Sequence, residues 1–220
     1  MKFKLFQKLA SLEGLELAML IAAAVIFAGL LTGIVLYRKK HPEEEQTVRT
    51  GRTKILIQGA MCMTLSFVLS YFKLFSMPFG GSITLVSMLP LMFYAYLYGP
   101  AYGFLAAFAY SLLQVIQGAY IVHPVQFILD YFVAFTCLGL PGLFRKNLLL
   151  GIAVGGFSRM LVSVISGVIF FSDSGFEYGI TNPWIYSFAY NLLTIGVDTV
   201  LCMIVGALPA FRKLENIMKK

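Results

Sequence analysis

A carboxylate at residue 130 lies in the most apolar part of the sequence, and its neighbours have the chemistry of a cation site. No Asp, Glu, Lys or Arg occurs between Lys73 and Asp130. Gln126 is four residues before the acid, so on a helix the two side chains share one face. Tyr120 and Tyr131 bring aromatic rings to the same region. A carboxylate among aromatic rings suits an organic cation, because the acid supplies charge and the rings supply cation–π attraction.

A second polar group lies in "NPWIYSFAYN", residues 182–191. Tyr186 and Asn191 begin the last apolar segment at a depth similar to that of Asp130. Asn offers both a donor and an acceptor, which suits the edge of a heteroaromatic ring. Hydrogen bonding between helices is the alternative role for this side chain. Trp184 is typical of an anchor at the membrane–water interface.

Arg159 and Ser163 are one helical turn apart in a third apolar segment. A buried Arg needs a counter-ion, and Asp198 in the last segment lies at a comparable depth. We expect a structural Arg159–Asp198 pair. Pairing of Arg159 with Asp130 is the alternative, and it would make that carboxylate structural as well.

The composition indicates an integral membrane protein. The chain has 220 residues, of which 59% are apolar and only 12% charged, and its mean hydropathy is +0.83. A soluble domain carries about 25% charged residues. The net charge of +7 comes from basic residues in short loops, which favours anionic lipid headgroups over nucleic acid as a partner.

Known catalytic patterns are missing from the sequence. It contains no GxxxxGK[ST] phosphate loop and no HExxH, and its three cysteines form no CxxC pair. We therefore expect no enzyme activity, no cofactor and no metal site, and we expect the cysteines to be small core residues.

Apolar runs and turn signals divide the chain into membrane spans of about 20 residues. Residues 17–37 predict a retained N-terminal transmembrane helix, because the run is too long for a signal peptide and "RKK" follows it. The predicted domains are the N-terminal helix segment 1–40, a cytoplasmic linker 41–53, a six-helix membrane domain 54–211 and a basic cytoplasmic tail 212–220. The six spans are roughly 54–73, 83–99, 101–118, 124–144, 148–171 and 183–211, separated by turn signals at 77–81, 98–103, 123–124 and 181–183.

The distribution of positive charge predicts the orientation of the protein in a cell membrane. With residues 38–54 inside, the inside loops hold nearly all of the Lys and Arg residues after the first helix, and the outside connections hold only Lys73. The C-terminus is then cytoplasmic, and the N-terminus is outside.

Four stretches together resemble one known family. They are "GGSITLVSMLPL", "LLQVIQGAYIVHPVQFILDYFVAFTCLGLPGLFR", "RMLVSVISGVIFF" and "NPWIYSFAYN". These resemble the ThiT/YuaJ family, the thiamine-specific S components of energy-coupling factor (ECF) transporters, over about residues 53–211. The resemblance implies a six-helix S-component bundle, here preceded by one extra helix. It also implies capture of thiamine from outside and uptake driven by an ECF module of one transmembrane subunit and two ATPases.

The resemblance also implies roles for individual residues. Asp130 would meet the positive charge and the aminopyrimidine of thiamine, and Tyr120 would belong to the pocket rim. Tyr186 and Asn191 would hydrogen-bond the pyrimidine, and Phe171 would stack on the ligand.

Two positions depart from the family pattern. Ser163 stands where the family commonly has a His that contacts the pyrimidine. Ala60 and Thr64 fall on an AxxxA motif that docks on the shared membrane subunit, and Thr64 replaces its second Ala.

Other functions stay open from the sequence. An S component for another vitamin, or for a thiamine precursor, would keep the aromatic rim but would not need the cation. A stand-alone secondary transporter would use Arg159 and Asp198 and would work without ATPases.

Overall fold

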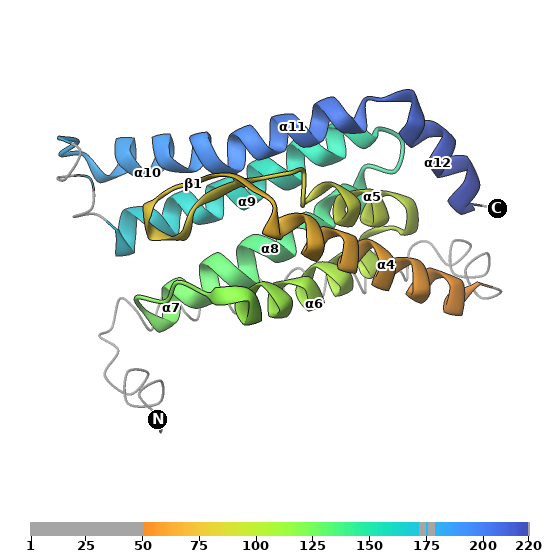
Figure 1. Cartoon of the computed structure of the whole chain (residues 1–220), viewed down its shortest axis with the longest axis horizontal. Coiled ribbons are helices and arrows are strands. Elements are labelled where there is room, and N and C mark those ends of the chain that lie inside the picture. The colour runs from red at the N-terminus through yellow and green to blue at the C-terminus, as the bar shows by residue number, and fades with distance from the viewer. Residues whose placement is uncertain (1–50, 172–174, 176–178, 220) are drawn as a thin grey trace, which may run out of the picture.

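The described part of the chain is a bundle of long helices. The structure is a computed structural model, and it describes residues 51–171, 175 and 179–219 (Figure 1). Within these residues, five helices are long and apolar enough to cross a membrane, as predicted for a multi-pass membrane protein. They are Arg52–Tyr71 (α4), Pro100–Gly118 (α6), Pro124–Leu143, Leu148–Phe170 (α9) and Pro183–Gly206. The predicted helix over 17–37 lies outside the described residues.

Two of the five helices contain a wider, π-helical segment. The first runs through α7 (Pro124–Phe127), a π-helical segment (Ile128–Val133), α8 (Ala134–Thr136) and a 3₁₀ segment (Cys137–Leu143). The second runs through α10 (Pro183–Asn191), a π-helical segment (Leu192–Gly196) and α11 (Val197–Gly206). Asp130 lies within the first π-helical segment, and Asn191 directly precedes the second. Such segments are frequent at functional sites, where they redirect side chains.

The predicted turn signals coincide with helix starts. α6 begins with Pro100 after Gly99, whose φ of 87° is the left-handed conformation that Gly adopts readily. His123 caps α7, because its Nδ1 accepts from the Val125 N–H at 3.2 Å. Asn182 caps α10 in the same way, accepting from the Trp184 N–H at 2.9 Å.

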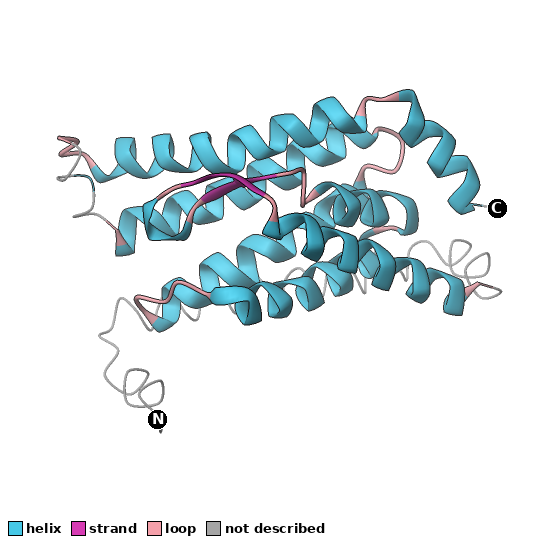
Figure 2. Ribbon diagram, in the orientation of Figure 1, coloured by secondary structure: helices cyan, strands magenta, loops and turns pink. Residues whose placement is uncertain are grey.

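The predicted span over 83–99 is wrong at its start. Residues Lys73–Ser76 (β1) and Ser82–Thr84 (β2) form an antiparallel hairpin instead, with Phe75 opposite Ile83, and α5 covers only Leu89–Tyr98 (Figure 2). Pro90 explains the late start, because its ring would clash with the carbonyl of Val86 in a longer helix. Val86 leaves the helical region altogether, with a φ of 50°. Ten helical residues span about 15 Å, half of the hydrocarbon core.

Helix α5 is the centre of the apolar core. Leu89 and every residue from Leu91 to Leu97 are buried. The Tyr94 hydroxyl donates to the Ile55 carbonyl of α4 at 3.2 Å, so the polar group of this buried side chain is hydrogen-bonded inside the bundle. Cys202 is fully buried in the same cluster, in agreement with its predicted role as a small core residue.

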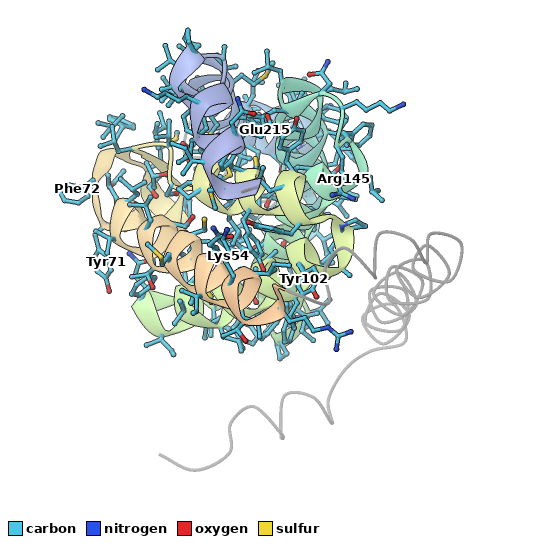
Figure 3. The ribbon with its side chains drawn as sticks, turned by 90° about the vertical axis from the view of Figure 1, so that its right-hand side faces the viewer. Lys54, Tyr71, Phe72, Tyr102, Arg145 and Glu215 are labelled. Carbon is cyan, nitrogen blue, oxygen red and sulfur yellow. The ribbon has the colours of Figure 1, made fainter. Side chains whose placement is uncertain are left out.

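The last predicted span, 183–211, also ends early. Gly206 ends α11, and Pro209 begins a separate helix, α12 (Pro209–Lys219), which crosses the end of the bundle (Figure 1). Phe211 of α12 packs edge-on against Phe93 of α5, with ring centroids 5.2 Å apart. Lys54, Arg145 and Glu215 lie at this end of the molecule, while Tyr71 and Phe72 point outward at the end of α4 (Figure 3).

Several helices approach each other closely at glycines. A Cβ atom on Gly142 would lie 2.5 Å from the Pro100 nitrogen and 2.6 Å from the Gly99 carbonyl carbon. These neighbours are backbone atoms, which cannot rotate away. The 3₁₀ segment therefore contacts the start of α6 only because residue 142 has no side chain.

Gly142→Ala is expected to lower stability by about 1–3 kcal/mol, because the new methyl group overpacks a backbone contact. The measurement is the thermal unfolding midpoint of the purified protein in detergent. Gly51→Ala is the matched control, since nothing lies within 4 Å of a Cβ at that position. Equal midpoints for the two variants would contradict the close packing of the 3₁₀ segment on α6.

Candidate functional site

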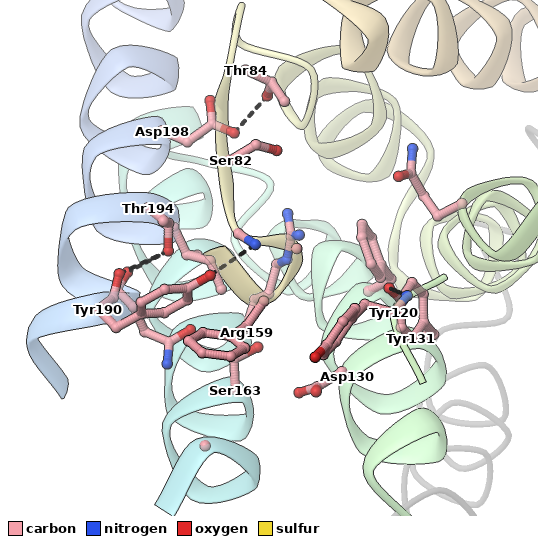
Figure 4. Close-up of a pocket in the computed structure, with 18 of the residues that line it drawn as sticks. Ser82, Thr84, Tyr120, Asp130, Tyr131, Arg159, Ser163, Tyr190, Thr194 and Asp198 are labelled. Carbon is pink, nitrogen blue, oxygen red and sulfur yellow. Dashed lines mark hydrogen bonds between the residues drawn. The ribbon is translucent and has the colours of Figure 1, made fainter. Parts of the chain in front are cut away.

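A cavity of about 220 Å³ lies between the hairpin and the helices, and its lining is rich in polar and aromatic side chains (Figure 4). Residues from α6, the α7–α8 helix, α9, α10 and α11 contribute to its wall, together with the end of α4 and the hairpin. All eight predicted substrate-binding residues line it: Tyr120, Gln126, Asp130, Tyr131, Ser163, Phe171, Tyr186 and Asn191. Side chains that are far apart in the sequence therefore line the same cavity.

The acidic part of the wall is built by the α7–α8 helix. Asp130 Oδ2 accepts from Gln126 Nε2 at 2.7 Å, which is the pair expected from the spacing of four residues. Gln126 is 2% exposed, and its amide also bonds the backbone of Val122 and Tyr120. The acid is thus held by a side chain that is itself fixed, and it lines the cavity.

Three aromatic rings meet at the cavity, and we call Phe79, Tyr120 and Phe171 the aromatic trio. The Tyr120 and Phe171 rings are stacked, with centroids 6.1 Å apart, and the Phe79 ring is 6.3 Å and 5.9 Å from them. Tyr131 supports the trio, because its hydroxyl accepts from the Tyr120 N–H at 2.8 Å. Phe79 comes from the turn of the hairpin and has a φ of 62°, which is unusual for a non-glycine residue.

The α10 helix supplies an amide and a hydroxyl. Asn191 is 7% exposed, and its Nδ2 donates to the Ser187 carbonyl at 2.9 Å. Tyr190 ties the hairpin to this helix: its hydroxyl accepts from the Gly81 N–H at 2.8 Å and donates to the Pro78 carbonyl. The hairpin is therefore fixed over one side of the cavity by a side chain that also lines it.

The predicted Arg159–Asp198 pair does not form as a hydrogen-bonded ion pair, although both residues line the cavity. Arg159 lies 4.1 Å from the centre of the Phe135 ring, and its Nη1 donates to the Met88 sulfur at 2.7 Å. Asp198 instead accepts from Thr84 Oγ1 at 2.7 Å. Among the described residues, neither Arg159 Nε nor Asp198 Oδ1 has a hydrogen-bond partner. The prediction rested on the similar depth of the two residues in the membrane. Depth alone does not determine which way a side chain points or what it contacts.

Sequence reasoning missed other lining residues. Thr84 of the hairpin was hidden by the predicted span 83–99, whereas Phe79 lies in the predicted turn "MPFGG" and was not considered as a site residue. On α6, Gln114 and Gln117 also line the cavity. The sequence pattern that could have identified them is a pair of amide side chains three residues apart in an otherwise apolar run. This spacing places both side chains on one face of the helix.

Other predicted residues lie away from the cavity. Ala60 and Thr64 are exposed on α4, where they do not line it. Trp184 is 60% exposed near the start of α10, as expected for an interfacial side chain.

The arrangement suits a small organic cation with polar edges. Asp130 supplies a carboxylate, the aromatic trio supplies ring faces, and Asn191 supplies an amide oxygen, since its Nδ2 donates to Ser187. Within residues 51–171, 175 and 179–219, no three His, Cys, Asp or Glu side chains gather as a metal site.

Comparison with known proteins adds independent information. The sequence model of the family described as "Thiamine transporter protein (Thia_YuaJ)" matches residues 56–217. The thiamine transporter ThiT of Bacillus subtilis (strain 168) is 30% identical over 180 residues, covering 74% of this chain and 90% of that protein. ThiT of Lacticaseibacillus paracasei (strain ATCC 334) is 31% identical over 122 residues, covering 47% of this chain and 58% of that one.

A solved structure has the same fold. ThiT from Listeria monocytogenes superposes with a TM-score of 0.59 at 22% identity, covering 76% of this chain and 94% of that one. The family match spans most of the membrane bundle and includes every predicted cavity residue. The chain therefore belongs to the thiamine transporter family Thia_YuaJ.

Proposed function

We propose that this chain is the substrate-binding membrane subunit of an ECF-type vitamin transporter and that it captures extracellular thiamine. The observation that carries the proposal is the Asp130 carboxylate in a cavity rimmed by the aromatic trio. Thiamine joins a cationic thiazolium to an aminopyrimidine, so it needs both a negative charge and a donor–acceptor edge. Membership of a transporter family, rather than an enzyme family, agrees with this reading.

In the proposed mode of binding, each part of the cavity has a separate task. Asp130 pairs with the positive charge, and Gln126 keeps the carboxylate in place through its 2.7 Å hydrogen bond. Tyr120 and Phe171 stack on the ligand rings, and Tyr131 holds Tyr120 through its backbone. Tyr186 and Asn191 bind the pyrimidine edge, with Ser163 beside them on α9.

We infer the orientation in the membrane from the distribution of charge. Lys54 and Arg145 lie at the end of the bundle where α12 crosses it, and this end would be cytoplasmic (Figure 3). Asp130 and Asn191 lie near the starts of helices whose first residues, Pro124 and Pro183, belong to the opposite end (Figure 1). The cavity would then be nearer the outside, as capture from outside requires. The outside position of the N-terminus stays a prediction from the sequence.

The ATPase partners are part of the same proposal. The sequence has no phosphate-binding loop, so energy for uptake would come from an ECF module of one transmembrane subunit and two ATPases. Ala60 and Thr64 are exposed on α4, where small side chains allow another helix to approach closely. We propose this face as the docking surface.

Asp130→Asn is expected to weaken thiamine binding roughly 10- to 150-fold, because it removes a charged interaction while Asn can still accept from Gln126. Calorimetric titration of the purified protein measures this, with emission of Trp184, the only Trp, as a second signal. The matched control is Gln58→Leu, on a side chain that bonds Tyr98 away from the cavity, and it should bind thiamine as the wild type does.

Equal affinity of wild type and Asp130→Asn for thiamine would contradict charge pairing. A wild type that binds no thiamine would contradict the substrate itself. It would favour another vitamin or a precursor, with Ser163 as the first position to test.

Ala60→Trp is expected to abolish uptake in proteoliposomes with the ECF module while thiamine affinity stays unchanged, because the bulky ring blocks close helix approach. Ile204→Trp is the matched control, on the 60% exposed side chain of α11. Uptake by the chain alone, driven by an ion gradient, would instead identify a secondary transporter.

A further inference from the structure

The turn of the hairpin has a backbone conformation that is unfavourable for one of its residues. Phe79 has a φ of 62°, and the next residue, Gly80, has a φ of 91°. Glycine adopts this left-handed region readily, whereas a residue with a Cβ atom does so at a cost in energy. The Phe79 ring nevertheless reaches the aromatic trio, 6.3 Å from Tyr120 and 5.9 Å from Phe171. The position of this ring therefore depends on contacts that hold the turn.

Tyr190 of α10 holds the turn with a single hydroxyl group. Its oxygen accepts from the Gly81 N–H at 2.8 Å, and its hydrogen goes to the Pro78 carbonyl. A phenol donates one hydrogen and can accept another, so the two bonds form at the same time. Pro78 and Gly81 lie on either side of Phe79 and Gly80. One hydroxyl thus connects the two ends of the turn that carries the Phe79 ring.

The residue type at position 81 matches this contact. A Cβ atom on Gly81 would lie 2.2 Å from the Tyr190 hydroxyl oxygen and 2.7 Å from Tyr190 Cζ. Any side chain at this position would therefore push the hydroxyl away from the turn. The contact depends on the absence of a side chain at residue 81 as well as on the hydroxyl of residue 190.

The base of the hairpin is held by the same membrane-spanning helix. Thr84 of β2 donates to Asp198 at 2.7 Å. Tyr190 and Asp198 are eight residues apart, which on a regular α-helix would separate their directions by about 80°. The π-helical segment Leu192–Gly196 lies between them, and its extra residue reduces this angle to about 20°. Nearly one helix face therefore contacts both the turn and the base of the hairpin.

We propose that Tyr190 is a positioning residue for the ligand, because its hydroxyl holds the Phe79 ring in the aromatic trio. Tyr190 also lines the cavity, but its one hydrogen is used by Pro78 and is not available to donate to a ligand. A turn that is ordered before binding spares the ligand the cost of ordering it. The inference rests on the proposed function and assigns the hairpin a part in its affinity.

The test is a double-mutant cycle of Tyr190→Phe and Phe79→Ala, in which thiamine affinity is measured by calorimetric titration. Tyr190→Phe keeps the ring and removes only the hydroxyl. It is expected to weaken thiamine binding roughly 5- to 30-fold, mainly through faster dissociation, which a chase of labelled thiamine measures. In the Phe79→Ala protein, the same change should cost less than about twofold, because no ring is left to position. Tyr96→Phe is the matched control: it loses a hydroxyl bond to Glu215 away from the cavity, and its affinity should equal that of wild type.

Gly81→Ala gives a second route to the same result. Its methyl group displaces the Tyr190 hydroxyl, so it should weaken binding as Tyr190→Phe does, and again only while Phe79 is present. The cycle can therefore be completed with this variant if Tyr190→Phe folds poorly.

Two results would overturn the inference while leaving the proposed function in place, provided that thiamine binding still depends on Asp130. The first is unchanged thiamine affinity in Tyr190→Phe. The second is a double variant in which the losses from Tyr190→Phe and Phe79→Ala multiply, which would mean that Tyr190 does not act through the Phe79 ring. A wild type that binds no thiamine would remove both proposals.

Discussion

The half-length of α5 is the constraint on which the rest of the structure depends. The helix after α4 begins only at Leu89, because the Pro90 ring disfavours a helix that includes Val86, and Val86 itself has a φ of 50°. Helix α5 is therefore short, and it is buried along its length. The hairpin of β1 and β2 takes the place of a longer helix. A cavity lined by polar and aromatic side chains lies between this hairpin and the helices.

Charge inside this cavity is tolerated by three different arrangements. Asp130 accepts from Gln126, Asp198 accepts from Thr84, and Arg159 lies against the Phe135 ring and the Met88 sulfur. An ionisable group in hydrocarbon costs about 2.5–3.5 kcal/mol on insertion scales, so each arrangement offsets part of that cost. The three groups form no hydrogen-bonded ion pair with one another, although Arg159 interacts electrostatically with both carboxylates. In the proposed function, the Asp130 carboxylate is what distinguishes a cationic ligand from a neutral one.

Local spacing predicted the parts of the site that lie on one helix. Gln126 and Asp130 are four residues apart, and their hydrogen bond follows directly from helix periodicity. The helix starts at Pro100 and Pro183 could also be predicted from short stretches of sequence, because Pro and its capping neighbours act within a few residues.

Contacts between segments could not be predicted in the same way. The aromatic trio joins residues 79, 120 and 171 through helix packing, which no short-range pattern encodes. The Arg159–Asp198 prediction used depth alone, but a contact also depends on the direction in which each helix face points. Residue 198 follows a π-helical segment, and such a segment rotates the following helix face.

Helix α4 connects the two halves of the proposed function. Its inner end carries Ser70, which lines the cavity, and its surface carries the exposed Ala60 and Thr64. A ligand in the cavity and a partner at Ala60 and Thr64 would therefore contact the same helix. The hairpin also begins directly after α4 and is anchored to α10 by Tyr190. In the proposed function, a small shift of α4 would thus move both Ser70 and the hairpin, and this would give the partner a physical route to the binding site.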